Sequence, residues 1–187
     1  MSKKSNAALV VGSGVAGIQA SLDLAESGYS VFLVDKSSSL GGKLAQLDKQ
    51  FPTDNCGMCK MLPFSADISE VCLKRGIMHP NVEFIPNAEI KEFSGSPGDF
   101  SVTINEQTQY VISEKCIGCA LCVDICPVKV EDEFNEGLST RKAIYVRCPT
   151  SIPNKYIIDI AQCTKCGECV KICPTKAIDL ADRKSVV

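Results

Sequence analysis

The chain has 187 residues, with 20 lysines and arginines against 22 aspartates and glutamates, so its formal net charge at pH 7 is −2. That balance argues against the strongly basic surface by which proteins bind nucleic acids or anionic membranes. Hydrophobic residues make up 45% and charged residues 22% of the chain, which is typical of a folded globular protein. The unusual feature is the number of cysteines, which is twelve. Proteins this rich in cysteine commonly use it for disulfides, zinc sites or iron–sulfur clusters.

The sequence near the N-terminus helps to decide between these uses of cysteine. Only Ala7–Val11 forms an apolar stretch behind the basic start, and Gly12 ends it, which is too short for a signal peptide. No stretch approaches the 18 apolar residues of a membrane-spanning helix. We therefore expect a cytoplasmic chain, in which structural disulfides are rare and the thiols serve metal binding or redox chemistry.

The first fifth of the chain predicts a β-α-β unit. The continuous apolar run Ala7–Val11 is typical of a buried parallel strand. Apolar residues at helical spacing follow from Val15 to Ala25, and Ser30–Val34 is predicted as a second strand. Between the first strand and the helix lies a Gly-x-Gly-x-x-Gly fingerprint, which lets the chain turn tightly, approach a pyrophosphate and pack helix against strand. The predicted phosphate-binding residues are Gly12, Gly14, Val15, Ala16 and Gly17.

Asp35 ends the second strand, where a carboxylate can bind the ribose hydroxyls of a dinucleotide. Together with its neighbour Lys36 it completes the predicted nucleotide site, and an acid at this position argues against NADP. Gly41-Gly42-Lys43 resembles the second glycine pair of the two-dinucleotide-binding flavoproteins, which favours FAD over NAD. The alternative is a glycine-rich turn without a ligand, which the flanking strand, helix and acid make a poor explanation.

The last two fifths of the chain contain an internal repeat. Cys116, Cys119, Cys122 and Cys126, followed by proline, recur 47 residues later as Cys163, Cys166, Cys169 and Cys173. Apolar residues at 123 and 170, and at 125 and 172, also match, and we expect them in a shared core. In two-cluster ferredoxins the fourth cysteine of each run ligates the other cluster. We therefore predict one 4Fe–4S cluster on Cys116, Cys119, Cys122 and Cys173, and a second on Cys163, Cys166, Cys169 and Cys126. Zinc is the alternative, although it usually takes paired Cys-x2-Cys knuckles.

The sequence thus divides into two domains of different class. Residues 1–112 form a partial FAD-binding, Rossmann-like α/β domain, in which 82–85, 89–93, 100–104 and 109–112 are expected as short strands. Residues 113–187 form an α+β ferredoxin-like domain with two 4Fe–4S clusters and a polar insertion at about 131–155.

Four cysteines lie outside the repeat, namely Cys56, Cys59, Cys72 and Cys148. Cys56 and Cys59 have chelating spacing, so the four thiols are candidates for a third cluster. The alternatives are a redox-active Cys56–Cys59 dithiol beside the flavin and small residues buried in a core.

Several segments together resemble the A subunit of heterodisulfide reductase. They are 11–20, 40–49, Phe51-Pro52-Thr53 with Cys56 and Cys59, and 136–145 between the ferredoxin halves. The resemblance implies a thioredoxin-reductase-like FAD domain with a ferredoxin insert, which serves as the flavin and iron–sulfur component of a larger electron-transfer complex. Its partners would be HdrB- and HdrC-like subunits, or electron donors of the hydrogenase or dehydrogenase type. Family members continue beyond the insert, so a chain that stops at Val187 is expected to be a fragment or a split subunit.

Two functions follow from these features. The first is an oxidoreductase subunit that passes electrons between FAD and 4Fe–4S clusters. The second is a ferredoxin-type carrier or docking subunit without catalysis, which does not retain flavin alone. Bound flavin in the purified protein distinguishes them.

Overall fold

The computed structural model describes residues 6–47, 49, 79–148, 152–181 and 185–186. The chain forms two compact units, Met1–Glu106 with Val186–Val187, and Gln107–Ser185. Three of the cysteines outside the repeat, Cys56, Cys59 and Cys72, lie outside the described residues, so their predicted roles stay predictions.

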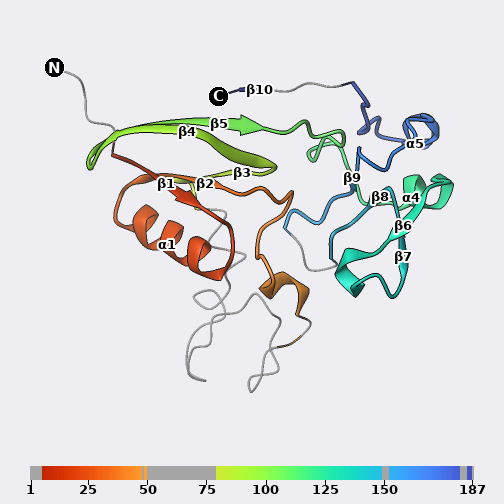
Figure 1. The fold of residues 1–187 in the computed structure, drawn as a ribbon, viewed down its shortest axis with the longest axis horizontal. Coiled ribbons are helices and arrows are strands. Elements are labelled where there is room, and N and C mark those ends of the chain that lie inside the picture. The colour runs from red at the N-terminus through yellow and green to blue at the C-terminus, as the bar shows by residue number, and fades with distance from the viewer. Residues whose placement is uncertain (1–5, 48, 50–78, 149–151, 182–184, 187) are drawn as a thin grey trace. The chain divides into compact units, whose positions relative to one another are not determined.

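A parallel sheet with one helix forms the start of the first unit (Figure 1). Strand β1 (Ala7–Val11), helix α1 (Val15–Glu26) and strand β2 (Ser30–Val34) confirm the predicted β-α-β unit. Strand β3 (Val82–Ile85) pairs in parallel with β2, which gives the order β1-β2-β3. The helix buries one apolar stripe, formed by Ile18, Leu22 and Ala25. It ends where Gly28, at φ +89°, donates a hydrogen bond back to the Ala25 carbonyl.

An antiparallel hairpin completes the first unit. Strands β4 (Ala88–Ser96) and β5 (Asp99–Glu106) are joined by Pro97-Gly98, where Gly98 has the positive φ that a tight turn requires. The short strand β10 (Ser185–Val186) adds to β5. Val34, Ala88 and Ile104 form a small core that joins the hairpin to the parallel sheet. The hairpin is longer than the predicted strands because pairing continues to Ser96 and Asp99 at the turn, with one shift in register between Ile90 and Glu92.

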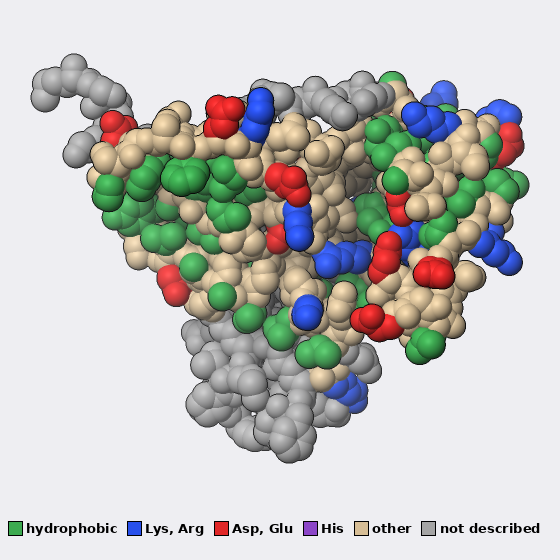
Figure 2. All heavy atoms as spheres, in the orientation of Figure 1, with side chains coloured by type: hydrophobic (Ala, Val, Ile, Leu, Met, Phe, Trp, Pro, Cys, Tyr) green, Lys and Arg blue, Asp and Glu red, His purple; other side chains and the backbone are tan. Residues whose placement is uncertain are grey.

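The hairpin also presents apolar side chains to solvent. Hydrophobic side chains gather on the exposed face of the first unit in Figure 2. Phe93 on β4 is 76% exposed and Phe100 on β5 is 60% exposed. Exposed aromatic side chains of this size are typical of surfaces that contact other protein.

The second unit contains two short helices and two short antiparallel sheets. Helices α4 (Leu121–Ile125) and α5 (Glu168–Ile172) follow the first two cysteines of their repeats, and each contains and buries the third cysteine, Cys122 or Cys169. Strand β6 (Lys129–Glu131) pairs with β7 (Thr140–Lys142), and β8 (Ile144–Tyr145) pairs with β9 (Ile157–Ile158). The 3-10 helix η2 (Glu133–Asn135) lies between β6 and β7; a second 3-10 helix, η1 (Leu44–Gln46), belongs to the first unit.

The core of the second unit differs from the expectation in two ways. Val111 lies in this core and bridges to Ile178, so the segment expected as a strand at 109–112 packs within the second unit. Among the matched apolar residues, Val123 packs against the core, but Ile125 is 42% and Ile172 is 38% exposed. Helices of five residues have only a narrow buried stripe, which Cys122 and Cys169 occupy. No helix among the described residues is long and apolar enough to span a bilayer.

Candidate functional site

The glycine fingerprint forms a tight loop between β1 and α1. Gly12 has φ +96° and donates its N–H to the Val34 carbonyl at 2.7 Å. A Cβ placed on Gly17 would lie 1.8 Å from the Gly12 carbonyl oxygen, so only glycine allows this approach of helix and strand. A Cβ on Gly14 would meet no protein atom within 4 Å. Gly14 therefore leaves open space at the start of α1, where a pyrophosphate binds in dinucleotide folds.

The second glycine pair packs directly on this loop. The Gly41 N–H donates to the Ser13 carbonyl at 2.8 Å. Gly42 has φ +54°, and a Cβ there would lie 3.3 Å from the Gly14 Cα. The predicted residues Gly41, Gly42 and the exposed Lys43 are thus brought beside the first fingerprint.

Asp35 holds the glycine loop through its carboxylate. One oxygen accepts hydrogen bonds from the backbone N–H and the hydroxyl of Ser13, the latter at 2.7 Å, and the other accepts from the Ser37 N–H at 2.7 Å. Burial alone would raise the pKa of Asp35, but these hydrogen bonds outweigh it and keep the pKa below its ordinary value. The sequence spacing did not predict the contact between Asp35 and Ser13. Asp35 therefore holds the glycine loop in place, in addition to the ribose contact that we expect of it.

A hollow of about 330 Å³ opens beside Asp35 in the first unit. Its walls combine predicted residues, Gly12, Asp35 and Lys36, with the start of β4 at Ala88, Glu89 and Ile90. The volume falls in the range of about 300–1,000 Å³ that is usual for small-molecule sites. The β4 residues were missed by sequence analysis because their approach depends on the packing of the hairpin.

We expect Asp35→Ala to weaken FAD binding roughly 10- to 150-fold. The substitution removes charge-assisted hydrogen bonds worth about 1.5–3 kcal/mol, whether they reach the ribose or hold Ser13 in place. Equilibrium titration of FAD into the deflavinated protein measures the effect, and Glu26→Ala, an exposed acid at the end of α1, is the control. Ser13→Ala separates the two tasks, since it removes only the hydroxyl contact within the loop. Tighter binding of NADPH than of FAD would contradict the assignment of Asp35.

In the second unit, two cavities are lined by cysteines in crossed sets. The first cavity is lined by Cys116, Cys119, Cys122 and Cys173, together with apolar residues that include Val111 and Tyr156. The second is lined by Cys163, Cys166, Cys169 and Cys126, with Ile144 and Ile158 among its walls. Each cavity thus combines three cysteines of one repeat with the fourth cysteine of the other.

The backbone explains how three cysteines spaced by two residues reach one cavity. Each Cys-x2-Cys-x2-Cys run contains two residues with a left-handed backbone conformation. They are Gly118 and Ala120 in the first run, and Lys165 and Gly167 in the second. They turn the chain around the cavity before α4 and α5 begin at residues 121 and 168. The fourth cysteines follow these helices, and Pro127 or Pro174 comes next.

The chemistry of these thiols fits a polynuclear metal cluster. Burial raises the pKa of the Cys122 thiol to about 11, and nearby Cys116 and Cys119 add to the rise. Burial also raises the pKa of Cys169. Grouped, buried thiols of this kind need the positive charge of bound metal to become thiolates.

The fourth cysteine of the second run and the arrangement of the thiols also bear on metal binding. At Cys173 burial would raise the pKa, but hydrogen bonds from the Ala177 N–H and from Thr175 lower it. Among the residues that the structure describes, no three Cys, His, Asp or Glu side chains converge on a point that would hold a single ion. The thiols line each cavity in sets of four, as the ligands of a 4Fe–4S cluster do.

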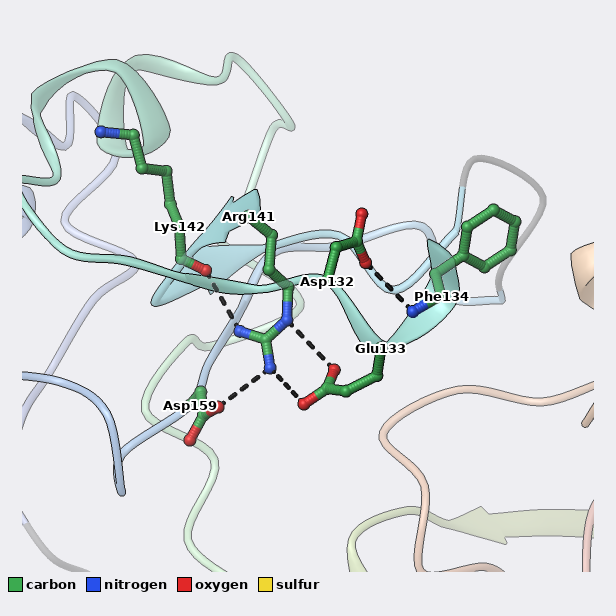
Figure 3. A network of polar contacts seen from close by, with 6 residues as sticks. All are labelled: Asp132, Glu133, Phe134, Arg141, Lys142 and Asp159. Carbon is green, nitrogen blue, oxygen red and sulfur yellow. Dashed lines mark hydrogen bonds and ion pairs between the residues drawn. The ribbon is translucent and has the colours of Figure 1, made fainter. Parts of the chain in front are cut away.

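The insertion between the repeats carries a charged network around Arg141 (Figure 3). Its guanidinium forms a two-point contact with Glu133 at 2.6 and 3.1 Å and donates to Asp159 at 3.0 Å. It also lies 3.9 Å from the centre of the Tyr145 ring. Partial burial would lower the pKa of Arg141, but these hydrogen bonds raise it. The network ties the β6–β7 hairpin to the loop after β9.

We expect Arg141→Met to lower the free energy of unfolding of the second unit by about 2 kcal/mol. The Arg141 side chain is only 7% exposed, and its loss leaves the half-buried Asp159 without a cation. Anaerobic urea denaturation followed by circular dichroism measures the change. Lys171→Met is the control, because the Lys171–Glu168 ion pair lies on the surface. Equal stability of both variants would contradict this role for the network.

Of the cysteines outside the repeat, the structure describes Cys148. Its side chain is 4% exposed and lies in the second unit, outside the residues that line the two cavities. The described residues therefore do not test whether Cys148 belongs to a third cluster.

Two family models match the chain. An FAD dependent oxidoreductase family matches residues 8–52, and a 4Fe-4S dicluster domain matches residues 115–177. FAD and two 4Fe–4S clusters are therefore the cofactors of the chain, as predicted, and the Rossmann-like and ferredoxin-like fold classes are confirmed.

Curated relatives match over most of the chain. The iron-sulfur A subunit of a CoB--CoM heterodisulfide reductase from Methanopyrus kandleri is 44% identical over 83% of the chain and 22% of its own length. The A subunit of an H(2)/formate:CoB-CoM heterodisulfide,ferredoxin reductase from Methanococcus maripaludis is 46% identical over 81% and 22%. A protein from Archaeoglobus profundus, named as similar to the heterodisulfide reductase A subunit, is 43% identical over 81% and 21%.

The chain thus spans about one fifth of the length of these relatives. Among solved structures, L-proline dehydrogenase from P.horikoshii aligns with 54% of this chain and 19% of its own, at a TM-score of 0.39 and 19% identity. Over about four fifths of its length, the chain is similar to the A subunits of heterodisulfide reductases.

Proposed function

We propose that the chain is an electron-transfer subunit of an HdrA-like oxidoreductase complex. The observation that carries the proposal is the pair of cavities with crossed cysteine sets, encoded in one chain with a dinucleotide-type glycine loop. FAD exchanges two electrons and each cluster exchanges one, so the combination couples hydride-type chemistry to single-electron flow. The chain would act as a flavin and iron–sulfur oxidoreductase subunit.

The residues of the chain have separate tasks in this proposal. The loop from Gly12 to Gly17 leaves the backbone open to the pyrophosphate, while Asp35 orients the adenosine half and Gly41-Gly42 closes over the loop. The eight cysteines of the repeat hold the clusters. Cys119 and Cys166 are exposed, so each cavity has one ligand at the surface, where electrons can enter or leave.

The partners are other subunits of a redox complex. The named relatives are subunits of heterodisulfide reductases, some of which the names couple to hydrogen, formate or ferredoxin. We infer that this chain exchanges electrons with HdrB- or HdrC-like subunits, or with a hydrogenase- or dehydrogenase-type donor, in the cytoplasm. Exposed Phe93 and Phe100 support a protein contact on the first unit.

A ferredoxin-type carrier that does not keep flavin by itself is the second candidate. The FAD dependent oxidoreductase family matches only residues 8–52, whereas the dicluster domain matches 115–177. Both candidates use the same cysteines, but only the first requires the glycine loop to bind FAD.

Anaerobic purification with iron, sulfide and flavin quantitation tests the proposal. The leading function predicts at least about eight iron atoms, four for each of the two ferredoxin-type clusters, together with bound FAD. Eight iron atoms without flavin, even after addition of FAD, would favour the carrier. A colourless protein that contains zinc would contradict both candidates.

We further propose that Cys56, Cys59 and Cys72 hold a third cluster near the flavin; whether Cys148 joins them stays a prediction. About twelve iron atoms per fully reconstituted chain is then the expected result, because three cubane clusters hold four each. Variants in which Cys56 and Cys59 are replaced by serine should fall back to about eight. Eight iron atoms in the unsubstituted protein, together with ready alkylation of Cys56, would instead support the dithiol.

A further inference from the structure

Two lysines of the insertion reach back to the backbone of the cluster motifs. The Lys142 ammonium donates to the Cys126 carbonyl at 2.5 Å, and the Lys155 ammonium donates to the Cys116 carbonyl at 2.5 Å. Cys126 lines the second cavity and Cys116 lines the first. Each cavity therefore has one lysine bonded to the carbonyl of one of its own cysteines.

The fold positions both lysines from outside the repeat. Lys142 ends β7, opposite Lys129 of β6, and its carbonyl accepts a hydrogen bond from Arg141. Figure 3 shows its ammonium pointing away from the Arg141 network. Lys155 precedes Tyr156, which lines the first cavity. Both side chains come from partly buried residues of the segment between the two cysteine runs.

These two cations differ from Arg141 and Lys171, which pair with carboxylates. Arg141 is neutralised by Glu133 and Asp159, and Lys171 pairs with Glu168. Within the described residues, neither Lys142 nor Lys155 has an ion pair with a carboxylate. Their positive charges are therefore directed at the cysteine backbone.

We propose that Lys142 and Lys155 are positioning residues that each raise the reduction potential of one cluster, Lys142 for the second cavity and Lys155 for the first. The inference rests on the proposed function, because it concerns the clusters that carry the electrons. Reduction adds one electron, and so one negative charge, to a cluster that is already anionic with four thiolates. A nearby ammonium stabilises the reduced form more than the oxidised form, and partial burial strengthens this effect. The hydrogen bond to the cysteine carbonyl also fixes where the charge lies.

Potentiometric titration monitored by electron paramagnetic resonance tests this proposal on the anaerobically reconstituted full chain. We expect Lys142→Met to shift one midpoint potential to a more negative value and Lys155→Met to shift the other. Arginine at either position keeps the charge and should largely restore the potential. Lys129→Met, which removes an exposed lysine from the strand opposite Lys142, is the matched control and should shift neither.

A cysteine variant assigns each shift to a cluster. In a Cys173→Ser background only the second cluster is expected, so Lys142→Met should move the remaining potential and Lys155→Met should not. Unshifted potentials in both methionine variants, or a shift of the same cluster by both, would overturn the proposal. A methionine variant that loses four iron atoms is judged by the arginine variant at the same position. If arginine restores the iron content but not the midpoint potential, the proposal is also overturned. Absence of clusters in the unsubstituted protein would instead refute the proposed function, so the two failures are distinguishable.

Discussion

Replacing Cys173 with serine is expected to remove the cluster of the first cavity, although Cys173 belongs to the second cysteine run. Cys173 lines the cavity formed by Cys116, Cys119 and Cys122. Serine is a poor ligand for iron compared with a thiolate, so the iron content should fall from about eight to about four atoms in these two clusters. Iron analysis and electron paramagnetic resonance of the reduced protein measure the loss.

Cys126→Ser is the reciprocal variant. Cys126 follows the first run but lines the cavity of Cys163, Cys166 and Cys169, so this variant should lose the other cluster. Each single variant should keep one spectrum, and the two retained spectra should differ. If Cys173→Ser instead damaged only the cluster held by Cys163, Cys166 and Cys169, the crossed assignment would be refuted.

Alanine at Gly17 and alanine at Gly14 are expected to have different consequences for the first unit. At Gly17 the added Cβ would lie 1.8 Å from the Gly12 carbonyl oxygen, so helix and strand must separate. Overpacking against backbone should destabilise the unit by about 3 kcal/mol or more and abolish FAD binding. At Gly14 the Cβ meets no protein atom within 4 Å, so the unit should fold normally.

FAD binding then becomes the diagnostic measurement for Gly14→Ala. If the pyrophosphate approaches the Gly14 backbone, the new methyl group displaces it. The pyrophosphate then loses at least one hydrogen bond with the protein, in which it is the charged partner. That loss corresponds to roughly tenfold or more in affinity. Circular dichroism checks the fold of both variants, and flavin titration checks binding. Unchanged FAD affinity in Gly14→Ala would contradict a phosphate site at this loop.

Local patterns in the sequence were sufficient for the elements that depend on near neighbours. The apolar run at 7–11 and the helical repeat from Val15 predicted β1 and α1, because backbone period and side-chain burial are set within a few residues. Gly17 was assigned to close helix–strand packing by its place in the fingerprint, and its contact with Gly12 bears this out. The repeated cysteine spacing likewise predicted which thiols would surround each cavity.

Contacts between distant segments were decided only by the tertiary structure. The pattern did not reveal that Asp35 would hold Ser13, or that Lys142 and Lys155 would reach Cys126 and Cys116. Nor did it place Val111 against Ile178, which assigns this segment to the second unit. Each of these contacts joins residues at least 16 positions apart. Whether such groups meet depends on the path of the intervening chain and on the packing of whole elements, and neither leaves a periodic signal in the sequence.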